Sequence, residues 1–291
     1  MIRRLNQPAV RLLLLYLAGL VALLGGLGSL AGQVGPGGSP AGPGSSPTGS
    51  SPTDSSPTTA APASARAAAP FLARQRQNLV VLGDSVPAAT ACDCPGFGTE
   101  LARSVQPAQL VNAAVPGLTS QGLLVQLDSP AVIQALREAT VVTVTVGAND
   151  FDTALADQDT CAQASCYGPE LRDLDATMGQ IAGRLAALVQ PSTKVVLTGY
   201  WNVFLDGRVG AERGPAYVAT SDALTREVNA AVARAAAGAH QGYADLYSPF
   251  KGDGSRDDTG LLAADGDHPD AAGHALIAAV IATTAGLSTL Q

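Results

Sequence analysis

The sequence predicts a layered α/β sandwich built on parallel strands. Short β-branched apolar runs alternate with longer stretches that carry apolar residues at helical spacing, from residue 71 onward. The connections between them are short, as expected for parallel strands joined by right-handed crossovers. Roughly 220 residues remain after an N-terminal segment of different composition, which is the size of one domain. Since 46% of the chain is apolar, this domain can bury a sizeable core.

The predicted strands are short runs rich in Val and Leu. The first run, Leu79–Leu82, ends at Gly83, where the chain is expected to turn. The others are Leu110–Val111, Val141–Val146, Val195–Leu197 and a weaker run near Tyr243–Leu246. In sheets of this kind ligands bind beyond the carboxyl ends of the strands, so the residues that follow each run are candidates for function.

Three longer stretches are predicted to be helices. The first, Leu171–Val189, has apolar residues at helical spacing and stops before Pro191. The second, Ser221–Ala237, is rich in alanine, and Ser221 or Asp222 is the expected N-cap. The third, Pro269–Ala285, begins with proline in its first turn and ends near Gly286.

The first 31 residues have the pattern of an export signal. Three arginines and no acidic residue precede an uncharged, leucine-rich run from 12 to 31. Small residues at Ser29 and Ala31 would permit cleavage after Ala31. Because the run is also about as long as a bilayer-spanning helix requires, a retained signal anchor is an equally good interpretation. We therefore expect an exported protein, either secreted or tethered to the outer face of the cytoplasmic membrane.

Residues 32–70 are predicted to form a disordered linker. They consist mainly of Gly, Pro, Ser, Thr and Ala, and such a segment cannot offset its ordering entropy by burying apolar surface. The Ser/Thr-Pro mixture resembles O-glycosylated stalks, and an unmodified spacer is at least as good an interpretation. The folded domain is then expected to span 71–291.

Charge and cysteine spacing argue against nucleic acid and metal. The net charge is −7, and no basic cluster lies beyond the extreme N-terminus. The Cys92-x-Cys94 and Cys161-x4-Cys166 spacings do not match a zinc knuckle, and no histidine lies near either pair in the sequence. We therefore expect disulfides. A Cys161–Cys166 bond closes easily, a Cys92–Cys94 bond forms a tight ring, and cross-pairing would tie two loops together, so the pairing stays open.

Polar residues follow the predicted strands and recur near the C-terminus. The four segments are Gly83 to Ser85, Asn112 to Gly117, Gly147 to Asp150 and Asp265 to Pro269. We expect all four at the rim of the sheet that binds ligands. Asp84 and Asp150 are predicted to be loop or cap residues. The acidic stretch 253–258 lacks the spacing of a calcium-binding EF-hand loop and is predicted to be a solvated surface loop.

Ser85 is the candidate nucleophile. A serine hydroxyl needs a base within hydrogen-bond distance, and that base needs an orienting acid. Among the three histidines, His240 ends an alanine-rich helix and His274 lies inside the last predicted helix, so both are predicted to be structural. His268 lies in a loop rich in Gly and Asp and is the candidate base.

Asp265 is the candidate acid. It precedes His268 by three residues, and in a turn this spacing can aim the carboxylate at one ring nitrogen and leave the other free for Ser85. Asp267 is the rival acid, but an adjacent residue usually points away from its neighbour. Asp267 and Asp270 are therefore predicted to have cap or loop roles.

The candidate donors of an oxyanion hole are the Asn149 amide and the backbone N–H groups of Gly117 and Ser85. Such donors stabilise the charged intermediate by about 2.7–4 kcal/mol each. Gly117 follows Pro116 in a predicted turn, where the lack of a Cβ lets the backbone approach a ligand. Taken singly, each is more often a turn glycine or a capping asparagine; only the combination, in this order along the chain, favours catalysis.

Together these motifs resemble the SGNH (GDSL-type) hydrolase family over about residues 76–288. The resemblance implies that Ser85 is the nucleophile, that Gly117 and Asn149 belong to the oxyanion hole, and that Asp265 and His268 are the acid and base. It also implies a flavodoxin-like three-layer α/β/α sandwich with about five parallel strands. Val86 stands where the family name has leucine, which is a conservative change. The chain contains no Gly-x-Ser-x-Gly motif, so the nucleophile elbow of larger α/β-hydrolases is absent.

The expected activity is therefore that of an exported serine ester hydrolase of the esterase or lipase type. It would need neither a metal nor an organic cofactor, and its substrate would be a small-molecule, lipid or glycan ester. We expect a monomer, with possible membrane anchoring through residues 12–31. The alternatives are an acyltransferase or deacetylase acting on cell-envelope glycans, and a non-catalytic binding module that retains the fold.

Overall fold

The computed structural model describes residues 77–105, 109–151 and 164–288. These belong to one compact unit, residues 68–291. The predicted export signal, the predicted linker and Cys161 lie outside the described residues, so the statements about them stay predictions. No helix among the described residues is long and apolar enough to cross a membrane.

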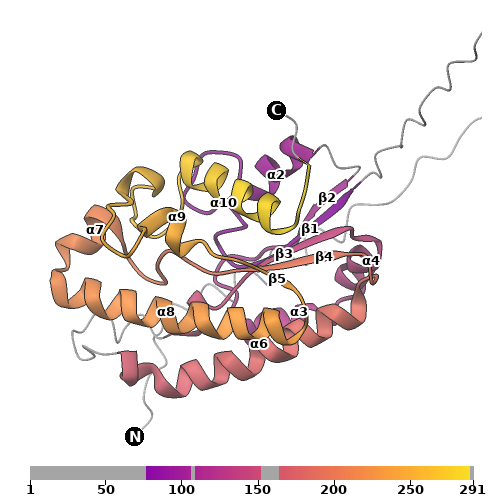
Figure 1. Ribbon diagram of the computed structural model, residues 1–291, viewed down its shortest axis with the longest axis horizontal. Coiled ribbons are helices and arrows are strands. Elements are labelled where there is room, and N and C mark those ends of the chain that lie inside the picture. Colours follow the sequence, from indigo (N-terminus) through magenta and orange to yellow (C-terminus); the bar gives the residue numbers. More distant parts are fainter. Residues whose placement is uncertain (1–76, 106–108, 152–163, 289–291) are drawn as a thin grey trace, which may run out of the picture. The chain divides into compact units, whose positions relative to one another are not determined.

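A five-stranded parallel sheet forms the centre of the described domain (Figure 1). Its strands are β1 (Asn78–Gly83), β2 (Gln109–Asn112), β3 (Val141–Thr145), β4 (Lys194–Thr198) and β5 (Gly242–Ala244). They lie in the order β2-β1-β3-β4-β5, and each neighbouring pair is parallel. This is the flavodoxin-like order. The predicted strand runs and the predicted fold class are confirmed.

Helices cover both faces of this sheet (Figure 1). On one face, α2 (Phe97–Val105) packs against α10 (Ala271–Thr284). The opposite face carries α3 (Ser120–Gln126), α4 (Pro130–Glu138), α6 (Gly168–Leu188) and α8 (Pro215–Gly238). The short helices α7 (Gly207–Glu212) and α9 (Tyr247–Lys251) follow β4 and β5. Strands β1 and β3 are buried from both sides, which explains why their sequences are largely apolar runs.

All three predicted helix starts are wrong, and α6 begins at Gly168 rather than at Leu171. Helix α8 begins at Pro215, with Gly214 at its N-cap, so neither Ser221 nor Asp222 caps it. Proline at the first helical position is well suited to start a helix, because its missing N–H would be unpaired there anyway. Helix α10 begins at Ala271 rather than at the predicted proline. Its N-cap is Asp270, whose carboxylate accepts the Gly273 N–H at 2.9 Å, and this confirms the predicted cap role of Asp270.

Gly83 fixes the point at which β1 ends and the chain turns. Its φ angle is +129°, and a Cβ at this position would lie 1.9 Å from the carbonyl oxygen of Thr145 on β3. Only glycine fits between the two strand ends. As a result, Ser85 emerges two residues later at the carboxyl edge of the sheet.

Candidate active site

Ser85 lies at the start of a hydrogen-bonded turn. The Asp84 N–H donates to the carbonyl of Thr145 at 3.0 Å, which continues the sheet by one bond. The carbonyl of Ser85 accepts the Thr90 N–H at 3.0 Å, and the Asp84 carboxylate accepts the Val86 N–H at 3.0 Å. The Ser85 residue is half-buried, and its hydroxyl forms no hydrogen bond with another described residue. The turn therefore holds the backbone while the hydroxyl stays available.

The loop that carries Asp265 and His268 is closed by its own backbone. The Ala263 N–H donates to the carbonyl of His268 at 2.8 Å, and the Gly266 N–H donates to the carbonyl of Ala263 at 3.1 Å. A third bond, from the Asp206 N–H to the carbonyl of Gly266 at 2.6 Å, ties the loop to the segment after β4. These bonds hold the loop in one conformation and so fix the position of Asp265 relative to His268. We call it the histidine loop.

Within this loop, the two carboxylate oxygens of Asp265 have different partners. Oδ1 accepts the backbone N–H groups of Asp267 and His268, each at 3.1 Å. Oδ2 lies 2.8 Å from Nδ1 of the His268 ring, whose side chain is 14% exposed. Burial alone would raise the pKa of Asp265, but these hydrogen bonds outweigh it and the pKa is lowered. Asp265 is therefore ionised at neutral pH and fixes the orientation of the ring.

Asp267 is the weaker partner of His268. Its Oδ2 lies 3.7 Å from Nδ1, beyond hydrogen-bond distance. Burial raises the pKa of Asp267. The geometry thus favours Asp265 over Asp267, as the sequence predicted.

Two of the three candidate oxyanion donors, Gly117 and Asn149, lie on loops that contact each other. Gly117 is exposed in a turn with φ of +77°, and its N–H forms no hydrogen bond with a described residue. The Asn149 amide donates to the carbonyl of Leu118 at 3.2 Å. Asp150 accepts the backbone N–H of Ser120 at 2.9 Å and also its hydroxyl. Asp150 therefore has a loop-fixing role, as predicted, and joins the loop after β3 to the start of α3.

Asp84 and Tyr200 form a buried pair beneath the turn that carries Ser85, which we call the nucleophile turn. The sequence analysis did not predict this pair. The Tyr200 hydroxyl donates to the Asp84 carboxylate and accepts the Ala148 N–H at 3.4 Å. Both side chains are about 1% exposed. Burial raises the pKa of Asp84 to about 7, although the bonds from Tyr200 and Val86 oppose this. Tyr200 follows β4 directly, so the strand-end rule that identified the other segments could have identified it.

A pocket of about 250 Å³ opens beside Ser85. Ser85, Asn149 and Asp267 contribute polar groups to its wall. The rest of its lining is largely apolar or aromatic and comes mainly from the segment after β4: Val86, Tyr200, Trp201, Val203, Phe204, Leu205 and Tyr217. A larger cavity of about 660 Å³ lies at the amino ends of β4 and β5 and contains none of the candidate site residues. The smaller pocket is the one placed to hold a substrate.

The structure joins some of the predicted site residues by hydrogen bonds, but not Ser85 and His268. His268 is bonded to Asp265, and Asn149 is bonded to the Gly117 loop. Ser85 and Asp267 line the same pocket, so the turn that carries Ser85 and the loop that carries His268 lie close to each other. Ser85 and His268 do not share a hydrogen bond in this structure. Hydrogen bonds between a nucleophile and its base commonly tighten only when substrate binds.

Behind the histidine loop lies a buried charge cluster. Both oxygens of Asp206 lie 2.6 Å from the Lys251 ammonium, and both side chains are 5% exposed. Asp258 is 1% exposed, and burial together with Asp206 raises its pKa to about 7. The prediction of a solvated loop over 253–258 is therefore wrong at Asp258, because this residue turns inward toward the ion pair.

The cysteine pairing is resolved in part. Cys92 and Cys94 are bonded to each other, although the sequence left this tight ring as one of several choices. Since Cys161 lies outside the described residues, a Cys161–Cys166 pair stays a prediction. His274 is fully buried on α10, as a structural histidine should be, but it lies beside Cys92 and Cys94. No histidine lies near these cysteines along the chain, but the fold brings His274 beside them in space.

Comparison with known proteins identifies relatives of this chain. Residues 81–276 match the model of the GDSL-like lipase/acylhydrolase family. No curated protein sequence matches. Among solved structures, the lipase Lip_vut3 from a goat rumen metagenome is 17% identical with a TM-score of 0.58, covering 72% of this chain and 97% of its own.

Two further structures share the fold. Phospholipase A1 from Streptomyces albidoflavus NA297 is 20% identical with a TM-score of 0.58, covering 72% of this chain and 100% of its own. Axe2, an acetylxylan esterase from Geobacillus stearothermophilus, is 18% identical with a TM-score of 0.52, covering 72% and 94%. At these identities the likeness establishes the fold alone.

Proposed function

The chain belongs to the GDSL-like lipase/acylhydrolase family and is an ester-hydrolysing serine hydrolase; from this premise we propose that it is an exported esterase with Ser85, His268 and Asp265 as its triad. In this proposal Ser85 attacks the ester carbonyl. His268 takes the serine proton at Nε2 and delivers it to the leaving alcohol. Water then hydrolyses the acyl-enzyme by the same route, with His268 again acting as base.

The bond between Asp265 and His268 carries the proposal. Because the Asp265 carboxylate faces Nδ1 at 2.8 Å, the ring proton of neutral His268 is held at Nδ1 and the lone pair at Nε2. That is the tautomer a general base requires. The negative charge of Asp265 also stabilises the imidazolium that forms when the serine proton is taken up.

The oxyanion would be held by the N–H groups of Ser85 and Gly117 and by the Asn149 amide. The two backbone groups support this role, since neither donates to another described residue. The bond from Asn149 to Leu118 aligns the asparagine with the Gly117 turn. Donors that are already in place lose little energy to reorganisation when charge develops on the carbonyl oxygen.

The pocket supports binding of the acyl group beside Ser85. Its volume is about 250 Å³, and Val203, Phe204 and Leu205 supply apolar wall. Burying one methylene against such a wall contributes about 0.8 kcal/mol. Acetyl esters would leave most of the pocket empty, so we propose that esters with longer acyl chains are preferred. A panel of p-nitrophenyl esters of increasing chain length tests this, and a maximum at acetate would contradict it.

The triad is tested by Ser85→Ala, with Ser255→Ala on an exposed loop as the matched control. We expect Ser85→Ala to lower kcat for a p-nitrophenyl ester by more than about 10³-fold. The Ser255→Ala variant should match the wild type. A fluorophosphonate probe should label the wild-type protein at Ser85, as mapped by peptide mass spectrometry. Normal turnover by Ser85→Ala, with an unchanged melting temperature, would refute the assignment.

Export is the part of the proposal that depends on residues 1–31. Their basic start and leucine-rich run support it. Cell fractionation separates the two forms: a released protein that begins after Ala31 indicates cleavage, and a full-length protein in the membrane fraction indicates a retained anchor. Protein confined to the cytosol would overturn the proposal of export.

A further inference from the structure

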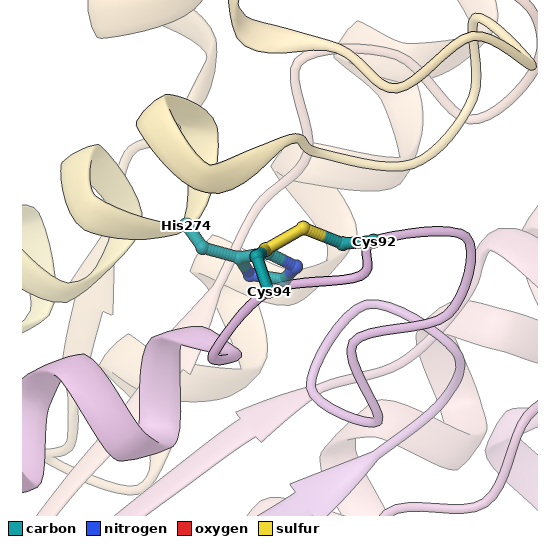
Figure 2. A group of neighbouring side chains, drawn as sticks. All are labelled: Cys92, Cys94 and His274. Atoms are coloured by element: carbon teal, nitrogen blue, oxygen red, sulfur yellow. A yellow bond between two sulfur atoms is a disulfide. The ribbon is translucent and has the colours of Figure 1, made fainter.

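Three side chains outside the proposed active site form a compact sulfur–nitrogen cluster. Cys92 and Cys94 lie in the loop between the nucleophile turn and α2, and His274 lies on α10. Figure 2 shows the His274 ring beside the Cys92–Cys94 bond. A ring nitrogen and the two sulfur atoms all lie within 4.8 Å of one another. Nothing in the proposed ester hydrolysis uses this cluster.

The hydrogen bonds of His274 determine which ring nitrogen carries a proton. The side chain is fully buried, and Nδ1 accepts the Phe97 N–H at 3.2 Å. Burial lowers the pKa of His274 to about 4, so the ring is neutral at physiological pH. Since Nδ1 uses its lone pair, the single proton of the neutral ring lies on Nε2. This Nε2–H is buried without a partner among the described residues, and such a group calls for a function or a missing ligand.

The same tautomer argues against a metal ion in this cluster. A histidine that binds a metal through one nitrogen normally donates a proton from the other to a carbonyl or carboxylate. Here Nδ1 accepts a hydrogen bond from the Phe97 N–H and Nε2 carries the ring proton, so neither nitrogen has a free lone pair. The two sulfur atoms are also bonded to each other. What the ring offers is a hydrogen-bond donor, and the matching acceptor is a thiolate.

We propose that Cys92 and Cys94 form a thiol–disulfide exchange site whose reduced form is stabilised by His274. The reductant is a dithiol. Its thiolate attacks one sulfur and forms a mixed disulfide, and the other cysteine leaves as a thiolate that accepts the Nε2–H bond. The second thiol of the reductant then attacks the mixed disulfide, which releases the second cysteine and closes the reductant's own disulfide. Two electrons pass from the dithiol to the protein. One of the dithiol's two protons is taken up by the second cysteine, and the other goes to solvent while the first cysteine remains a thiolate.

The position of the cluster fits this role. Cys92 and Cys94 are half-buried, whereas Ala91, Asp93 and Pro95 around them are exposed, so a thiol can approach from solvent. His274 lies on the buried side of the cluster. A hydrogen bond to an ionised acceptor is about twice as strong as one between neutral groups, so the bond gains strength when the thiolate forms. Stabilising a thiolate shifts a disulfide toward its reduced form.

The test measures the reduction equilibrium of the full-length protein in dithiothreitol buffers of defined ratio. Thiols are trapped with iodoacetamide and counted by mass spectrometry in the peptide that contains residues 92 and 94. His274→Leu removes the donor, and His274→Gln keeps an N–H at a similar position. We expect His274→Leu to need a ratio of reduced to oxidised dithiothreitol about tenfold higher than wild type, the effect of one hydrogen bond to a charged group. His274→Gln should lie closer to wild type.

A measurement on the wild-type protein alone covers the case in which His274→Leu fails to fold. The alkylation rate of the reduced pair against pH should give one thiol pKa at least about one unit below the ordinary value of about 8.5. The proposal is overturned if the pair stays oxidised at every ratio, if both thiols titrate near 8.5, or if His274→Leu equals wild type. Binding of one Zn²⁺ per reduced chain that depends on His274 would overturn it in favour of a metal site.

Discussion

Asp265→Asn is the substitution that most directly probes the proposed triad. In the structure, Oδ1 of Asp265 accepts two backbone N–H groups and Oδ2 faces Nδ1 of His268. An asparagine would keep its oxygen toward the backbone donors, which places its NH₂ group against Nδ1. Two donors cannot face each other, so His268 would move its proton to Nε2. The nitrogen that must accept the serine proton would then be blocked.

The expected loss follows from that tautomer change. A wrong tautomer at an enclosed triad lowers kcat by about 10⁴-fold in the serine-protease example of this effect. The Asp265 side chain is 37% exposed, so water can partly replace the lost interaction, and we expect about 10²- to 10³-fold here. This corresponds to about 3–4 kcal/mol of lost transition-state stabilisation. Asp267→Asn should lose less than about tenfold, because its Oδ2 lies 3.7 Å from Nδ1.

The assay is the pH profile of kcat and kcat/KM for a p-nitrophenyl ester, with melting temperatures as the check on folding. Asp265→Asn should fold, since asparagine retains the backbone contacts of Oδ1. The reasoning is refuted if Asp265→Asn keeps kcat within threefold of wild type. It is also refuted if Asp267→Asn has the larger loss, because Asp267 would then be the orienting acid.

Three further predictions concern the buried charges. Tyr200→Phe removes a hydrogen bond to the buried Asp84 carboxylate and should lower the free energy of unfolding by about 1.5–3 kcal/mol at pH 8, measured in urea; an unchanged midpoint would contradict this. Since the pKa of Asp84 is raised to about 7 from 3.8, the folded state binds more protons in that range. The stability of wild type relative to Asp84→Asn should therefore fall by about 4 kcal/mol as pH rises from 4 to 7 and then level off, and a flat difference would exclude the shift. Lys251→Met leaves Asp206 and Asp258 buried without a cation and should lower stability by about 3–5 kcal/mol at neutral pH, whereas a smaller loss would mean that water reaches the cluster.

The strands were predictable because burial on both faces requires continuous apolar runs. Leu79–Leu82 and Val141–Val146 carry this signature, and both lie in the centre of the sheet. The start of α8 was not predictable in the same way. Ser221 is a good N-cap residue by type, but its hydroxyl bonds to Asn202 inside the domain, and the helix continues N-terminally to Pro215. Tertiary contacts outweighed the local preference.

The candidate site likewise contains residues that local sequence predicts and residues that only tertiary packing brings together. Asp265 and His268 are three residues apart, so the loop between them sets their geometry and the sequence reveals the pair. Asp84 and Tyr200 are 116 residues apart, and only the neighbouring positions of β1, β3 and β4 bring them together. Sequence spacing carries no information on such a distance. The same holds for the contact between His274 and the two cysteines, which depends on the packing of α10 against α2.

The two segments that would carry the nucleophile and its base come from opposite ends of the domain sequence. The nucleophile turn follows β1, the first strand of the domain, and the histidine loop follows β5, the last one. Under the proposed triad, a chain that has not yet formed β5 holds Ser85 without its proposed base. The site would be complete only after the last strand has joined the sheet, so activity would require the whole domain to be folded.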